Sequence, residues 1–241
     1  MELIAGGVSI LLASFLGGAT GFGFALVATP LLLLIGFPLP FVITANLSLA
    51  LVTRVMIVVR FHGDVAPPRV IGLILGAVPG LWIGTQVLTG VDESTIKLCA
   101  GVVVMAAALL LLRSMTAPPP KPIPGAPLAA GFAGGFLGST TSLNGVAPVL
   151  LLARDQVSPR SFIADLAVYF VVTNALALVL LALEGALARS ALYPAFLLWL
   201  PGSLAGNWLG TVVGPRLPER TFRRITLLIV LVAGGVTALT A

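Results

Sequence analysis

The feature that most constrains this chain is an apolar run over residues 3–37 that carries no charged side chain. As one straight helix this run would be about 50 Å long, whereas the hydrocarbon core of a bilayer is about 30 Å thick. The chain must therefore turn or break, and the glycine-dense stretch at 17–23 allows this because glycine tolerates positive φ and close backbone approach. A break at membrane depth leaves backbone groups that lipid cannot satisfy, so it must face protein or a water-filled cavity. We expect a ligand site there.

Composition indicates a polytopic helical membrane protein. Of the 241 residues, 59% are hydrophobic and only 9% are charged, a balance that excludes a water-soluble domain. The net charge of +5 comes from Lys and Arg in short loops, which we interpret as topology signals and not as a nucleic-acid surface. Cys99 lies in an apolar run and His62 in a loop, so neither a disulfide framework nor a metal site is expected. We predict no metal and no cofactor, with membrane lipid as the surroundings.

Hydrophobic segments divide the chain into two similar halves. They are a broken segment at 3–37, helices at 41–60, 70–89 and 95–112, a second broken segment at 128–153, and helices at 160–183, 191–213 and 219–239. The proline-rich stretch at 113–127 is predicted to be an extended linker. The sequence thus predicts an all-α integral membrane protein of about eight segments, with a first transmembrane repeat at 1–112 and a second at 128–241. The N-terminus has no basic region and cleavage site of a signal peptide, so the first segment is expected to stay in the membrane.

Internal similarity supports the two repeats. The firmest match is a Pro-Gly-x-x-x-Gly motif at 79–84 and at 201–206, and both helices carry glycine every four residues. Such a ridge lets another helix backbone approach closely, although the embedded prolines leave a hinge as an alternative.

Basic residues favour an inverted over a parallel arrangement of the two halves. If each broken segment crosses the membrane once, the basic residues divide almost evenly between the two sides. If the chain instead reverses at the glycine break, only Lys97 and Arg189 lie on the other side of the membrane from the remaining Lys and Arg residues. Arg54 is left out of this comparison because it lies within a helix. The positive-inside rule expects a strong bias and so favours inversion, with both termini outside. Inverted repeats with broken helices are a recurrent transporter architecture.

The order of motifs resembles the sulfite exporter family of the TauE/SafE type. The resemblance rests on the glycine-rich first segment up to Pro30, the polar loop Arg60-Phe61-His62-Gly63-Asp64, the Pro-Gly-x-x-x-Gly helix and the repetition of this plan. It implies a multi-pass inner-membrane protein that moves sulfite, organosulfonates or related anions. The second break departs from the commonest pattern because residues 138–145 are rich in hydroxyl groups.

The two breaks contain groups that suit an oxyanion. Short helices beginning after Gly23 and after Asn144 would direct unpaired N–H groups and positive dipole ends at one central region. Neutral donors accompany them, and the candidate substrate-binding residues at the breaks are Thr20, Gly21, Gly23, Ser139, Thr140, Thr141, Ser142 and Asn144. The alternative is that these hydroxyls only cap the broken helices.

Four polar residues within helices complete the candidate set. Arg54 lies in an apolar run, where its guanidinium suits a bidentate contact with a sulfonate; the alternative is that it extends to the interface. Asp165 is a candidate to pair with Arg54 or to carry a coupling proton, or else is a buried carboxylate bonded to its surroundings. Asn46 and Asn174 are expected to hold helices together.

These features predict a secondary transporter for a small sulfur-containing anion that works by alternating access. An anion channel, or a transporter of another small oxyanion or carboxylate, is the alternative. A membrane enzyme is disfavoured because the sequence offers no nucleophile–base pair or metal set. The absence of a nucleotide-binding loop argues against direct ATP hydrolysis.

Overall fold

A computed structural model gives the fold, and it describes residues 2–92, 94–96, 98, 102, 106, 123–189, 191–214 and 228. Within these ranges the chain is helical and contains no β-strand. The predicted helices at 95–112 and 219–239 lie mostly outside the described residues, as does most of the linker at 113–127.

Helices follow the apolar segments of the sequence closely. In the first half they are α1 (Glu2–Thr20), α2 (Gly23–Ile35), α3 (Leu39–Phe61), the short η1 (His62–Asp64) and α4 (Pro67–Gly90). In the second half they are α6 (Ala126–Thr141), α7 (Val146–Arg154), α8 (Pro159–Leu183), the one-turn η2 (Ala191–Ala195) and α9 (Phe196–Val213). Proline stands in the first turn of α3, α4, α6 and α8, where its fixed φ suits a helix start.

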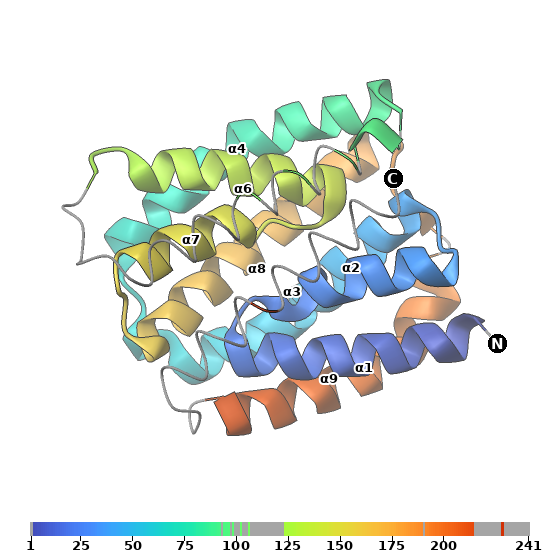
Figure 1. Ribbon diagram of the computed structural model, residues 1–241, viewed down its shortest axis with the longest axis horizontal. Helices are drawn as coiled ribbons and strands as arrows, with labels where there is room; N and C mark the ends of the chain where they lie inside the picture. Colours follow the sequence, from blue (N-terminus) through green and yellow to red (C-terminus); the bar gives the residue numbers. More distant parts are fainter. Residues whose placement is uncertain are drawn as a thin grey trace.

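Each broken segment is a hairpin of one longer and one shorter helix (Figure 1). The chain reverses between α1 and α2 at Gly21, whose φ of 86° favours glycine, and between α6 and α7 at Ser142, whose φ is 61°. Trp199 donates from Nε1 to the carbonyl oxygen of Leu3 at 2.8 Å and lies edge-on to Phe37, so the start of α1 and the end of α2 meet. At 13 and 9 residues, α2 and α7 are about 20 and 14 Å long, too short to cross a bilayer.

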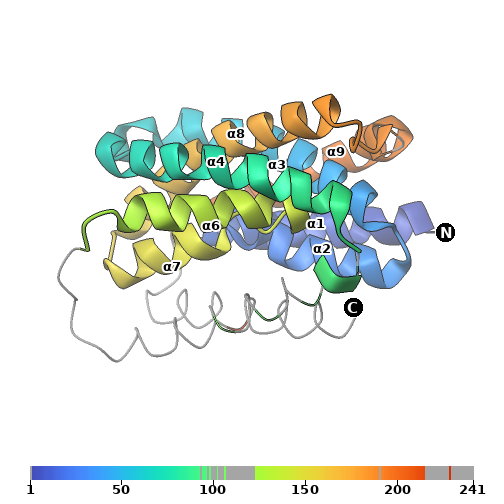
Figure 2. The same cartoon turned by 90° about the horizontal axis from the view of Figure 1, so that it is seen from above.

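Glycine ridges bring two pairs of helices together, α4 with α6 and α9 with α1 (Figures 1 and 2). A Cβ on Gly76 or Gly80 would overlap the carbonyl oxygen of Leu128 or Phe132 in α6. In the same way, Gly206 and Gly210 of α9 and Gly214, directly after it, lie against the carbonyl oxygens of Leu11, Phe15 and Ala19 in α1. Each ridge therefore packs a helix of one half directly against the first helix of the other half, as the spacing of four predicts.

Helices α3 and α8 run antiparallel through the middle of the bundle. At one end Thr44 of α3 accepts a hydrogen bond from the backbone of Ala188, just after α8, at 3.1 Å. At the other end Asp165, near the start of α8, contacts the connection between η1 and α4. Between these points Leu47 packs in one buried cluster with Ala177.

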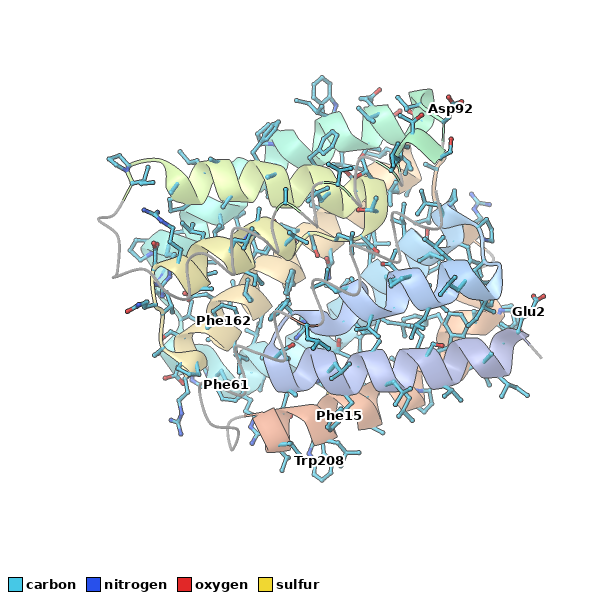
Figure 3. The ribbon with its side chains drawn as sticks, in the orientation of Figure 1. Glu2, Phe15, Phe61, Asp92, Phe162 and Trp208 are labelled. Atoms are coloured by element: carbon cyan, nitrogen blue, oxygen red, sulfur yellow. The ribbon has the colours of Figure 1, made fainter. Side chains whose placement is uncertain are left out.

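The outer surface is apolar, as expected for lipid contact. Among the described residues, five helices are long and apolar enough to cross a membrane: Glu2–Thr20, Leu39–Asp64, Pro67–Gly90, Pro159–Leu183 and Leu192–Val213. Large apolar side chains point outward from them, among them Trp82 and Trp208, the latter visible at the edge of the molecule in Figure 3. The chain is thus an integral membrane protein with several membrane-spanning helices.

Candidate functional site

The two chain reversals meet at a small cavity inside the protein. Phe22 and Phe24 line it from the first break, and Ser142 and Asn144 line it from the second. Helix α2 begins at Gly23 and α7 shortly after Asn144, so both short helices direct their N-terminal ends toward this region. The first turn of a helix presents unpaired N–H groups and the positive end of its dipole. Residues from both breaks therefore line one cavity.

Arg54 places a buried positive charge at this cavity. Its side chain lines the cavity and the residue is only 2% exposed. Nη1 donates to the carbonyl oxygen of Gly17 at 3.2 Å, and the guanidinium lies 5.3 Å from the ring centre of Phe170. Nε has no hydrogen-bond partner, and no carboxylate among the described residues forms an ion pair with this guanidinium. Arg54 thus lies inside the protein and does not extend to the membrane interface.

A cluster of three polar side chains joins the two halves beside Arg54. Nδ2 of Asn46 lies 3.0 Å from Oγ1 of Thr29 and 3.1 Å from Oγ of Ser142, and these two hydroxyls lie 3.0 Å apart. All three residues are buried, and Asn46 also lines the cavity. Asn46 of α3 therefore contacts α2 through Thr29 and the end of α6 through Ser142, and it also faces the cavity.

A second polar cluster supports the other break. Nδ2 of Asn144 donates to Oδ1 of Asn174 at 2.6 Å and to Oγ1 of Thr173 at 3.2 Å. The hydroxyl of Tyr169 lies 3.4 Å from the backbone oxygen of Asn144. Helix α8 thereby fixes the segment that connects α6 to α7, and Asn174 reaches the cavity alongside Asn144.

Several residues proposed from the sequence do not line this cavity. Thr20 donates to the carbonyl oxygen of Leu16 and accepts from the amide of Gly23 at 3.1 Å, so it caps α2. Gly21 and Gly23 supply backbone geometry. The hydroxyls of Ser139, Thr140 and Thr141 bond to backbone carbonyls, those of Thr140 and Thr141 one turn earlier in α6.

Asp165 lies apart from Arg54 and binds a different arginine. Its carboxylate accepts from the amide of Ala66 at 2.8 Å and from Nε of Arg69 at 2.7 Å, and it forms an ion pair with Nη2 of Arg69 at 2.6 Å. The carboxylate is buried, whereas the Arg69 side chain is 27% exposed. Asp165 therefore anchors α8 to the start of α4.

Sequence reasoning missed the aromatic residues and one hydroxyl of the site. Phe22, Phe24 and Phe170 line the cavity, and Thr29 bonds to Ser142. Phe22 and Phe24 flank Gly23 in the first break, which offered a signal. Thr29 and Phe170 lie within apolar helices, where nothing in the local pattern distinguishes them from packing residues.

Comparison with protein families gives the same assignment as the motifs. A family model described as "Sulfite exporter TauE/SafE" matches residues 7–237. The chain belongs to this family. No curated protein and no solved structure matched the chain. Membership of the TauE/SafE family, together with the long apolar helices, identifies a transmembrane transport protein.

Proposed function

We propose that this protein is a secondary transporter that moves a small sulfur-containing anion, sulfite or an organosulfonate, across the inner membrane. The observation that carries the proposal is the buried guanidinium of Arg54, which has no carboxylate partner in the described structure and lies where the two breaks meet. The description of the TauE/SafE family as a sulfite exporter family supports this choice of substrate class.

Electrostatics favour an anion as the partner of Arg54. A buried charge is costly in a low-dielectric interior unless an opposite charge compensates for it. A sulfonate or sulfite group would supply that charge and would match the planar fork of the guanidinium. The N-terminal ends of α2 and α7 would add partial positive charge without a second full cation. Binding would therefore be favourable and yet allow release.

We further infer that the two halves form an inverted repeat that supports alternating access. Three relationships support this: α3 and α8 are antiparallel, α4 packs on α6, and α9 packs on α1 in the equivalent way. The cavity measures about 10 Å³, room for about one water molecule. A larger anion would thus need the hairpins to separate, and rearrangement of one repeat against the other would open the site to each side in turn.

Two measurements test the proposed function. Purified protein should bind sulfite or organosulfonates in a thermal-shift or calorimetric screen, and more tightly than the matching carboxylates. Reconstituted into vesicles, it should move the same anions with a saturable rate. Binding of carboxylates alone would overturn the substrate class.

An anion channel is the alternative that shares the same donors. A channel requires a continuous pore, so its flux would rise with substrate concentration far beyond the range in which a carrier saturates. An enzyme would yield a covalently altered product in the same vesicles. Both readouts come from the transport assay.

A further inference from the structure

The hydrogens available in the Asn46 cluster determine which way its amide faces. Three contacts join Asn46, Thr29 and Ser142, and each requires one hydrogen. The two hydroxyls supply two hydrogens, so the third must come from the amide nitrogen of Asn46. Nδ2 therefore belongs inside the cluster and Oδ1 faces away from it.

The amide oxygen of Asn46 is left as a free acceptor. Oδ1 is buried and has no hydrogen-bond partner among the described residues, although Asn46 lines the cavity. A buried polar atom without a partner costs free energy comparable to a lost hydrogen bond. An acceptor cannot bind the oxygens of a sulfonate, so it requires a donor from another part of the ligand.

Asn46 and Arg54 lie on one face of α3, separated by two helical turns. Ala50 stands between them and also lines the cavity. The Cα atoms of Asn46 and Arg54 are about 12 Å apart along the helix, and long helical side chains point toward the N-terminus, which brings the guanidinium closer to Asn46. The side chain of Ala50 is a single methyl group and adds little bulk between the two polar groups, so a short ligand would lie along this stretch once the hairpins separate. The two polar groups are therefore placed to contact opposite ends of one short ligand.

We propose that Asn46 selects short sulfonates that carry a hydrogen-bond donor at the end opposite the sulfonate. Arg54 binds the sulfonate, and Oδ1 of Asn46 accepts a hydrogen bond from a hydroxyl or amino group. The inference rests on the proposed function, since it assumes that an anion occupies the cavity. It adds a second contact that distinguishes substituted sulfonates from plain alkyl sulfonates.

Two ligands of equal size and charge test this assignment. 2-Hydroxyethanesulfonate and propane-1-sulfonate differ only by a hydroxyl in place of a methyl group. The full-length wild-type protein should bind the hydroxyl compound roughly 2- to 10-fold more tightly, the effect of one net hydrogen bond. Equal or weaker binding of the hydroxyl compound would overturn the inference. If sulfite binds and neither sulfonate does, the inference is wrong and the proposed function stands; if neither sulfite nor a sulfonate binds, the proposed function itself is wrong.

Substitution of Asn46 locates the contact. Asn46→Leu keeps the number and branching of the side-chain heavy atoms and leaves the hydrogen bond between Thr29 and Ser142 intact, so it should remove the preference while propane-1-sulfonate still binds. Asn207→Leu replaces another buried asparagine, in α9 and away from the cavity, and should retain the preference. A preference that persists in Asn46→Leu would exclude Asn46 as the acceptor. If Asn46→Leu does not fold, Asn46→Ala serves the same comparison, and the wild-type ligand pair decides the selectivity by itself.

Discussion

Nη1 of Arg54 donates a hydrogen bond to the carbonyl oxygen of Gly17, 3.2 Å away at the last turn of α1. The same carbonyl accepts from the amide of Gly21 at 2.9 Å, so it lies within the turn that starts the first break. An anion that binds Arg54 would therefore act directly on the segment where the chain reverses. This contact connects ligand binding to the geometry of the α1–α2 hairpin.

Arg54→Gln should abolish tight anion binding. The substitution keeps length and polarity but removes the charge, and truncating one member of a buried charge pair costs about 2–4 kcal/mol of affinity. Arg54→Lys keeps the charge and loses the planar fork, so it should cost less. Calorimetry with the best sulfonate checks both variants.

Arg60→Gln is the matched control for this experiment. Arg60 belongs to the same helix, bonds to Thr211 and is not part of the cavity lining. Its substitution should leave affinity unchanged. Wild-type affinity in folded Arg54→Gln protein would exclude Arg54 from the site.

Asp165→Asn should lower thermal stability. The carboxylate accepts two hydrogen bonds and pairs with Arg69, and loss of charge-assisted bonds of this kind costs about 1.5–3 kcal/mol. Asp155→Asn removes a longer, more exposed contact to Arg154 at 3.7 Å and should cost less than about 1 kcal/mol. A variant that kept its melting temperature but lost transport would instead favour Asp165 as a carrier of a coupling proton.

Gly80→Ala should destabilise the protein by about 1–3 kcal/mol, the usual cost of overpacking. The added methyl group would overlap the carbonyl oxygen of Phe132 in α6. Gly90→Ala, at the end of the same helix, meets no described atom within 4 Å and serves as the control. Thermal unfolding in detergent measures both. If Gly80→Ala and Gly90→Ala melted at the same temperature, α4 and α6 would have to separate easily enough to accommodate the added methyl group.

Single cysteines should report the topology after Cys99 is replaced. The loop between α2 and α3 and the loop after α3 lie at opposite ends of the bundle (Figure 1). Arg60 and Arg69 flank the second loop, so the positive-inside rule places it in the cytoplasm. Pro38→Cys should therefore react with an impermeant maleimide from the periplasm, and His62→Cys should not. The reverse pattern would invert the proposed orientation.

Sulfite should bind more weakly as pH rises through its second dissociation. Arg54 is the one ionisable side chain among the described residues that line the cavity, and it offers a single positive charge. A monoanion matches that charge, whereas the dianion brings a second charge without a partner. Methanesulfonate remains a monoanion, so its affinity should stay constant. Stronger sulfite binding at high pH would contradict this charge matching.

Local patterns were sufficient to predict the helices within the described residues and the break in the first segment of each half. The length of each segment follows from the thickness of the bilayer, and glycine and proline act through their own backbone preferences. Helix length and helix breaks can therefore be predicted without knowledge of tertiary contacts. The reversal near Gly21 and the ridge through Gly80 are examples. The hydroxyl-rich second break shows the limit of such patterns. Helix α6 continues through Thr141, and the hydroxyls of Thr140 and Thr141 donate to backbone carbonyl oxygens of the same helix. Of the Ser and Thr residues in this break, only Ser142 lines the cavity.

Tertiary structure alone decided which polar groups meet. Asn46 and Ser142 are 96 positions apart, as are Arg69 and Asp165, and each pair joins one half of the chain to the other. Sequence spacing predicts neighbours within one helix but not between helices of different repeats. The sequence therefore determined a helical membrane protein with a break in the first segment of each half and an arginine, Arg54, within an apolar helix. The packing of the two halves determined that Arg54 faces the cavity without a carboxylate, because Asp165 is bound by Arg69 elsewhere.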